Sequence, residues 1–202
     1  VMPSRQSLCE DCPYVPLLET LLGVMKRHGG RDAFVVTGET GCMVRAQLPP
    51  WKILDVKYGM GASIGLATGL ACAGIPQTVV ALSGDSALIH SGLQQLIDAG
   101  QSGANLLVIV LANGTTALSG GQPHPATDHD ARGQRRQPAD LAAVIRAALP
   151  DGDSAGRVQV IDPEDTQDTG AALEKGLDAP GVSVVIAQRA CPLWEDGTRA
   201  AA

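Results

Sequence analysis

Two long apolar runs of the sequence end in polar residues whose types can bind a metal ion. The run "TVVALSG" (78–84) is followed by Asp85, and the run "NLLVIVLAN" (105–113) ends at Asn113. An unpaired carboxylate is costly to bury, so an Asp at the end of a buried strand indicates a ligand or a cap. Open α/β sheets bind their ligands just beyond the carboxyl ends of their strands. We therefore expect Asp85 and Asn113 to lie together at a binding site.

An Asp carboxylate and an Asn carbonyl form a hard oxygen site that suits Mg²⁺ or Ca²⁺, with phosphate oxygens as further ligands. Gly84 allows close approach of the backbone, and the helix that starts at Ser86 offers free N–H groups to a phosphate. The carbonyl of Thr115 can supply another metal ligand. Asp and Asn are also common caps of helices and turns, so each residue alone is open to that interpretation. Together they favour a metal-bound diphosphate.

The cysteines form a second candidate metal site. Cys9 and Cys12 have CxxC spacing, Cys42 follows the first predicted strand, and Cys191 follows the last one. Thiolates in this pattern suit a [4Fe–4S] cluster or a structural Zn²⁺. The alternative is a set of free thiols in a domain without a cluster. Cys72, within "GLACAG", is expected to be a small buried hydrophobic residue.

The elements that position these residues alternate between strands and helices. This alternation predicts βαβ units and a mostly parallel sheet flanked by helices, in one α/β domain over residues 1–202. Strands are predicted at 32–38, 78–84, 105–113, 157–162 and 181–190, and helices at 15–29, 60–74, 86–100, 138–149 and 164–177. The stretch 119–137 is the one long loop expected, and its basic cluster at 131–137 is interpreted as solvated.

Composition narrows the function classes. The formal net charge of −6 argues against a general nucleic-acid surface. No apolar run approaches the ~20 residues of a membrane helix, and no signal-peptide core is visible near the start. Five cysteines, an odd number, indicate thiols or metal ligands and a cytoplasmic location rather than a disulfide framework.

The polar strand ends resemble the thiamine-diphosphate motif, a GDG followed later in the chain by NN. Here the motif reads Gly84-Asp85-Ser86 and Ala112-Asn113-Gly114, and neither departure (Ser86, Ala112) replaces a metal-binding side chain. The resemblance implies Mg²⁺ held by the side chains of Asp85 and Asn113 and by the main-chain oxygen of Thr115.

Longer segments at 59–70, 84–92 and 113–125 are similar to the thiamine-diphosphate domain of indolepyruvate:ferredoxin oxidoreductase. They are more loosely similar to the β subunits of other 2-oxoacid:ferredoxin oxidoreductases. The resemblance runs from about residue 9 to residue 191. It implies a [4Fe–4S] cluster on the four cysteines named above. It also implies cofactor contacts at Gly61, Ala62, Ser63, Gly84, Asp85, Ser86, Asn113, Thr115 and Thr116.

Some of these residues remain open to a structural interpretation. Gly61, Ala62 and Ser63 can donate N–H and hydroxyl groups to phosphate, or can serve only close helix packing. His90, one turn into its helix, and His124, in "GGQPHP", are candidate substrate contacts and therefore candidate catalytic residues. The alternatives are a hydrogen-bonded, partly buried side chain for His90 and a structural loop residue for His124.

The resemblance implies the thiamine-diphosphate subunit of a 2-oxoacid oxidoreductase, which passes electrons to a cluster and then to ferredoxin or a similar acceptor. A partner subunit would supply the pyrimidine-binding domain and its catalytic Glu, which Glu39 does not match. Two alternatives stay open: a non-oxidative two-subunit 2-oxoacid decarboxylase, and a catalytically silent scaffold subunit. An apolar surface around 60–70 and 113–125 is expected to face the partner.

Overall fold

The computed structural model describes residues 8–9, 11–195 and 198–199. Six parallel strands form one sheet in the order β2-β1-β3-β4-β6-β5. The strands are β1 (Phe34–Gly38), β2 (Val56–Lys57), β3 (Thr78–Gly84), β4 (Leu106–Ala112), β5 (Val158–Ile161) and β6 (Val182–Gln188). A small antiparallel pair, β7 (Trp194–Glu195) and β8 (Thr198–Arg199), follows. The predicted parallel α/β sheet is confirmed.

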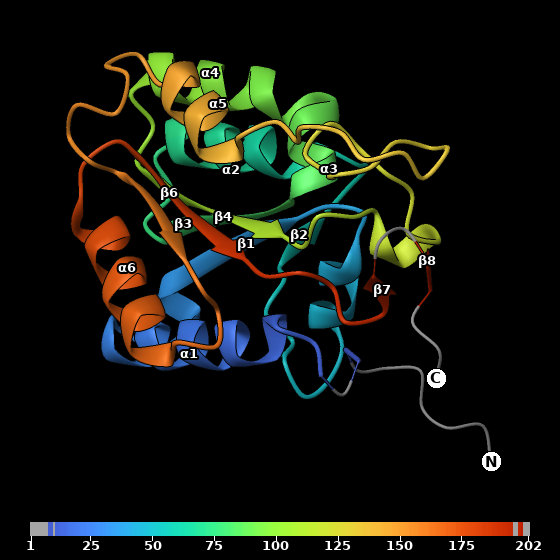
Figure 1. Cartoon of the computed structure of the whole chain (residues 1–202). Coiled ribbons are helices and arrows are strands. Elements are labelled where there is room, and N and C mark those ends of the chain that lie inside the picture. The colour runs from blue at the N-terminus through green and yellow to red at the C-terminus, as the bar shows by residue number, and fades with distance from the viewer. Residues whose placement is uncertain (1–7, 10, 196–197, 200–202) are drawn as a thin grey trace.

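Helices cover both faces of the sheet (Figure 1). Helices α1 (Tyr14–Arg27) and α6 (Thr166–Asp178) pack together on one face. Helices α2 (Ser63–Cys72), α4 (Leu93–Ser102) and α5 (Leu141–Ala148) pack on the other. None of the helices in the described part of the chain combines the length and apolar character needed to cross a membrane.

The central strand β4 is apolar on both faces, so helices must cover it on both sides of the sheet. All seven of its residues are buried, as expected for a parallel strand covered on both faces. Leu107, Ile109 and Leu111 point into the core under α1 and α6. Because side chains alternate along a strand, Val108 and Val110 enter the core on the opposite face.

Several predicted boundaries differ from the structure. The helix predicted at 86–100 is divided into a short turn, α3 (Asp85–Ala87), a π-helical segment, η3 (Leu88–Gly92), and α4. The helix predicted at 60–74 begins at Ser63, and the one predicted at 138–149 begins at Leu141, where the side chain of Asp140 accepts the N–H of Ala143. A side-chain cap therefore fixed that helix start rather than the proline.

Two segments carry more structure than the sequence indicated. Cys42 does not end a strand: β1 stops at Gly38, and Cys42 starts the 3₁₀ helix η2 (Cys42–Gln47). The loop at 119–137 includes an isolated bridge between His129 and Arg135, and it follows the 3₁₀ turn η4 (Ala117–Ser119). Cys72 was expected to be buried but is exposed, because it lies in the last turn of α2, away from the sheet.

Candidate functional site

The carboxylate of Asp85 connects the ends of two neighbouring strands. Asp85 is 3 % exposed, and its Oδ1 accepts the N–H of Ser86 at 2.8 Å. Its Oδ2 accepts the N–H of Gly114 at 2.7 Å. Gly84 pairs with Leu111 in the β3–β4 register, so both strands end at the same level of the sheet. The parallel register therefore brings the two polar strand ends together, as the sequence predicted.

The loop after β4 contains most of the other oxygen atoms that could bind a metal ion or a phosphate. Asn113 Oδ1 accepts the N–H of Thr115 at 3.1 Å, and the carbonyl of Thr115 accepts the N–H of Ala117 at 2.9 Å. The hydroxyl of Thr116 donates to the hydroxyl of Ser86 at 3.0 Å. Each carbonyl or amide oxygen keeps a second lone pair, so it can still bind a metal ion.

These residues line a common cavity of about 50 Å³ at the carboxyl ends of β3 and β4. Its wall includes Asp85, Ser86, Asn113, Thr115 and Thr116. One carboxylate, one amide oxygen and one main-chain carbonyl form the donor set that Mg²⁺ accepts when phosphate oxygens complete its coordination. A cofactor bound through these oxygens would extend beyond this small cavity.

His124 lies beside this carboxylate rather than in open space. Its Nε2 is 3.4 Å from Asp85 Oδ2, and both side chains are buried. The backbone N–H of Ala126 donates to His124 Nδ1, so in the neutral ring the hydrogen is on Nε2, facing Asp85. The guanidinium of Arg136 donates to the carbonyl oxygens of His124 and Thr127. The basic cluster at 131–137, interpreted as solvated, thus contributes Arg136 to the loop's internal structure, and Arg135 also pairs with Asp128 within the loop.

His90 is placed differently. It is exposed in η3, with Nδ1 3.2 Å from the hydroxyl of Ser91. It is not among the residues that line the cavity at Asp85. His124 does not line that cavity either, but it lies beside Asp85, whereas His90 is on the surface.

The segment Gly61–Ala62–Ser63 packs next to the site but does not line its cavity. The hydroxyl of Ser63 donates to the carbonyl of Thr37 at 3.2 Å, and Ser63 is fully buried. A side chain at Gly61 would overlap the hydroxyl of Ser91, and its φ of +80° is in the left-handed region. Met60, rather than these three residues, lines the cavity at Asp85. Close packing is the role that these contacts show.

Glu39 is a buried carboxyl group that holds three elements together. Its Oε1 accepts the hydroxyl of Ser83 at 2.7 Å and the N–H of Gly84 at 3.0 Å. The N–H of Ser63 lies 3.5 Å from Oε2. Burial raises the pKa of Glu39, and these hydrogen bonds, with one from Gly61, act in the opposite direction. The carboxyl group thus joins the loop before Cys42 to the strand end at the candidate diphosphate site.

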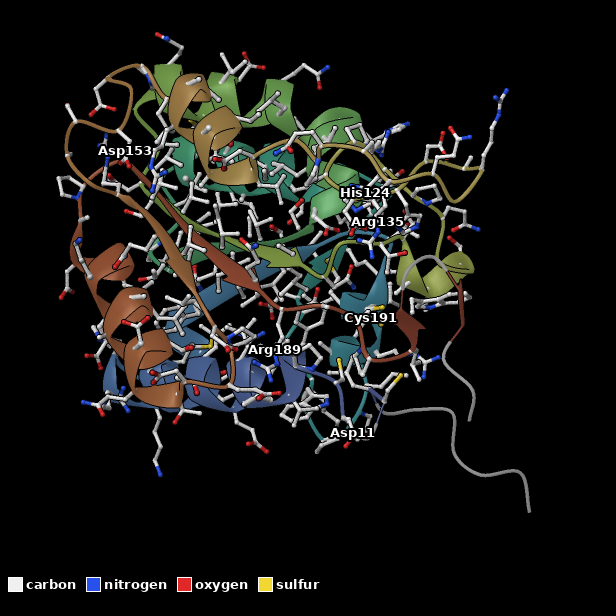
Figure 2. All side chains as sticks on the ribbon, in the orientation of Figure 1. Asp11, His124, Arg135, Asp153, Arg189 and Cys191 are labelled. Atoms are coloured by element: carbon white, nitrogen blue, oxygen red, sulfur yellow. The ribbon has the colours of Figure 1, made fainter. Side chains whose placement is uncertain are left out.

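The four cysteines from distant parts of the sequence lie around one cavity. Cys9, Cys12, Cys42 and Cys191 all line a hollow of about 440 Å³. Figure 2 shows Cys191 at the same end of the sheet as His124, with further sulfur atoms beside it, whereas Asp153 lies at the opposite end. The N-terminal segment and the C-terminal tail therefore meet the Cys42 turn at one edge, as a cluster on these residues requires.

Three of the thiols are partly buried, and this burial changes their pKa values. The pKa of Cys12 is raised to about 11 and that of Cys42 to about 12, mainly by burial, with a smaller contribution from the neighbouring cysteines; burial also raises the pKa of Cys191. Within the described residues, no three His, Cys, Asp or Glu side chains form a group that could hold a metal ion. This spacing argues against a preformed zinc site. A cubane cluster binds its ligands at four separate corners, so the broad hollow fits such a group better.

The backbone connects the two candidate sites. The N–H of Cys191 donates to the carbonyl of Asn113 at 3.2 Å. Trp194 lies against Gly121, where any side chain would overlap the indole ring. The tail that contains Cys191 is thereby fixed to the loop that contains Asn113.

Tyr14 also lies at this junction, and sequence reasoning missed it. It lines both cavities, together with Cys42, Asn113, Ala117 and Leu118. Burial raises the pKa of Tyr14 well above its ordinary value, and the nearby Asp85 and cysteines raise it further. The available signal was its position directly after "CEDCP" in a chain with only two tyrosines.

Comparison with known proteins decides the family. Residues 30–187 match the model of the thiamine pyrophosphate enzyme C-terminal TPP-binding domain, where TPP is thiamine diphosphate. The chain belongs to this family. The strand ends at Asp85 and Asn113 therefore lie in a TPP-binding domain.

Relatives of the domain are subunits of oxidoreductases. Indolepyruvate oxidoreductase subunit IorA of Pyrococcus horikoshii is 35 % identical over 98 % of this chain, which spans 31 % of that protein. 2-Oxoglutarate synthase subunit KorB of Archaeoglobus fulgidus is 28 % identical over 69 % of this chain and 54 % of that protein. The chain thus spans about a third of the length of the IorA relatives.

A solved structure shares the fold. The 2-oxoglutarate:ferredoxin oxidoreductase from Magnetococcus marinus superimposes with a TM-score of 0.80 at 17 % identity, over 93 % of this chain and 65 % of that one. A putative thiamin diphosphate-dependent enzyme from Mycobacterium smegmatis gives a TM-score of 0.59 at 20 % identity. At these identities the likeness concerns the fold of the TPP-binding domain.

Proposed function

We propose that this TPP-binding domain belongs to a 2-oxoacid:ferredoxin oxidoreductase and holds both the cofactor's diphosphate and a [4Fe–4S] cluster. The observation that supports this proposal is the shared wall between two cavities. Cys42 and Asn113 line both the hollow surrounded by thiols and the cavity at Asp85. A decarboxylase without electron transfer has no need for four thiols at that wall.

The diphosphate would bind through Mg²⁺ at the carboxyl ends of β3 and β4. Asp85, Asn113 and the carbonyl of Thr115 supply oxygen ligands to the metal in this proposal. The paired hydroxyls of Ser86 and Thr116 line the same cavity and can donate to phosphate oxygens. When bound, the cofactor supplies the electron sink for decarboxylation of a 2-oxoacid.

His124 acts in this proposal as a positioning residue for the metal ligand. Its Nε2 lies 3.4 Å from Asp85 Oδ2 but makes no hydrogen bond among the described residues, and the Arg136 guanidinium holds the backbone that carries the ring. A hydrogen bond from this N–H, formed when the metal binds, would hold the ligating carboxylate in one conformation. The structure offers no comparable contact between His90 and the cavity, so a substrate contact at His90 would need the partner to bring it there.

Cys9, Cys12, Cys42 and Cys191 would hold the cluster that receives the electrons and passes them to ferredoxin or a similar acceptor. Because burial raises the pKa values of Cys12, Cys42 and Cys191 in the metal-free protein, cluster binding would release protons and contribute to folding. A cytoplasmic location remains a prediction that follows from these free thiols.

A partner domain would complete the cofactor site with its pyrimidine-binding surface and a catalytic Glu. Met60 and Leu118 are exposed and line the cavity at Asp85. Exposed apolar side chains at the mouth of a cavity are typical of an interface. The proposed partner lies either elsewhere in a longer chain or in a separate subunit.

The experiment is anaerobic purification with the partner, followed by assays of iron, sulfide and thiamine diphosphate. Indolepyruvate is the first 2-oxoacid to test, since the IorA relatives are named for it. We expect a brown protein that reduces ferredoxin or a dye when the 2-oxoacid is added. Release of CO₂ without reduction of an acceptor would indicate the non-oxidative decarboxylase, and failure to bind the cofactor would indicate a silent scaffold.

A further inference from the structure

The hydroxyl of Tyr14 is buried without a partner. Tyr14 is the first residue of α1 and is 3 % exposed, and its Oη has no hydrogen-bond partner among the described residues. Buried tyrosines usually bond their hydroxyl, because a buried polar atom without a hydrogen bond destabilises the fold. The unpaired hydroxyl therefore indicates an acceptor other than the residues that the structure describes.

The position of Tyr14 limits what that acceptor can be. The side chain lines the hollow surrounded by thiols and also the cavity at Asp85. The oxygens of Asp85 accept the N–H groups of Ser86 and Gly114, and neither forms a hydrogen bond with the Tyr14 hydroxyl in the structure. The segment before Tyr14 contains Cys12, whose carbonyl accepts the N–H of Val15 in the first turn of α1. The helix therefore places the phenol and one cysteine of the thiol hollow together.

We propose that the Tyr14 hydroxyl donates a hydrogen bond to a sulfur atom of the cluster held by Cys9, Cys12, Cys42 and Cys191, and thereby raises its reduction potential. This inference rests on the proposed function. At neutral pH a phenol retains its proton and is a donor, and an anionic cluster offers acceptor sulfurs. Because reduction makes the cluster more negative, a donor stabilises the reduced form more than the oxidised form. Tyr14 is in this sense a positioning and tuning residue rather than a catalytic one.

The test compares Tyr14→Phe with the wild-type protein, both purified anaerobically with the partner. Tyr14→Phe removes only the hydroxyl, and Tyr58→Phe is the matched control, since Tyr58 is 73 % exposed. We expect the equilibrium constant for one-electron reduction of the cluster to be roughly tenfold smaller in Tyr14→Phe. This change corresponds to a reduction potential about 59 mV lower. The potential is measured by a redox titration followed by electron paramagnetic resonance. Tyr58→Phe should leave it unchanged.

A second measurement uses the metal-free protein. Because the hydroxyl is unpaired there, Tyr14→Phe should melt at the wild-type temperature or above it, which also shows that the variant folds. A lower melting temperature would mean that the hydroxyl already has a partner within the protein, and would overturn the proposal.

Other results would also overturn it. An unchanged reduction potential in Tyr14→Phe would overturn the proposal. If only the affinity for thiamine diphosphate changed, the Tyr14 hydroxyl would donate to that cofactor and not to the cluster. Loss of the cluster from a folded Tyr14→Phe protein would overturn the proposal too, since a single hydrogen bond is too weak to retain a cluster held by four thiolates. A wild-type protein without iron would overturn both this inference and the proposed function, whereas the other results leave the proposed function standing.

Discussion

Replacing Asp85 separates the structural role of the candidate metal ligand from its binding role. In Asp85→Ala the N–H groups of Ser86 and Gly114 lose their acceptor. Gly114 follows the end of β4, and its bond to Asp85 is the one that joins the two strand ends. Leaving that N–H unsatisfied costs about 1–3 kcal/mol of unfolding free energy. At ~2–4 °C per kcal/mol for a domain of this size, the melting temperature should fall by several degrees.

Asp85→Asn is not the mild substitution that its shape suggests. Each oxygen of Asp85 accepts a backbone N–H, one from Ser86 and one from Gly114. An amide has only one oxygen, so in either orientation its NH₂ group faces a donor. We therefore expect Asp85→Asn to lose stability comparable to that lost in Asp85→Ala.

The binding role is measured by the same thermal assay with thiamine diphosphate and Mg²⁺, in the presence of the partner. A ligand at 100 times its dissociation constant stabilises a protein by about 2.7 kcal/mol. The wild-type protein and Asp98→Ala, a control at an exposed position of α4, should show this stabilisation. Both Asp85 variants should lack it.

Two results would refute this reasoning. A cofactor-dependent stabilisation of wild-type size in Asp85→Ala would show that Asp85 is not a metal ligand. A melting temperature equal to that of the wild type without cofactor would show that the bond to Gly114 contributes nothing to stability.

Three further predictions concern the elements around this site. Cys42→Ser should remove the iron absorption and lower the melting temperature of the cluster-loaded protein, while Cys72→Ser, at an exposed site, should change neither; equal effects would contradict the assignment of the cluster ligands. Gly61→Ala should destabilise the protein by about 1–3 kcal/mol in urea unfolding, because the new side chain overlaps Ser91 and adopts a positive φ. Adding Ser91→Gly should recover part of the loss, and a wild-type midpoint for Gly61→Ala would speak against the contact. Because burial raises the folded-state pKa of Glu39, its stabilising contribution is complete at low pH and is lost as the pH rises through that raised pKa. Glu39→Gln should therefore show a smaller fall in unfolding free energy with rising pH, and an identical pH dependence would exclude the raised pKa.

The sequence by itself determined the fold class and the central pair of polar residues. The continuous apolar run at 105–113 predicts a buried parallel strand, and the strand over 78–84 has the same bounds in the structure. Residues that end such strands must lie at one edge of the sheet, because parallel strands share a direction. The neighbourhood of Asp85 and Asn113 follows from that geometry without any knowledge of side-chain contacts.

The tertiary structure alone decided which candidate residues approach the site. His90 and His124 are equally plausible in the sequence, yet the first is exposed and the second faces Asp85. That difference arises from the arginine and backbone contacts that shape the loop at 119–137, and no local pattern encodes them. Ser63 likewise looked available to phosphate, but Thr37 and Glu39 use its polar groups.

The same limit applies to the thiols and to Tyr14. CxxC spacing identifies one pair of cysteines, but their meeting with Cys42 and Cys191 depends on how both ends of the chain pack against one edge of the sheet. The unpaired hydroxyl of Tyr14 is visible only when every possible partner has a position. Sequence patterns record periodicity and local chemistry. Contacts between residues far apart in the chain depend on the packing of whole elements, and for this reason only the folded structure could reveal them.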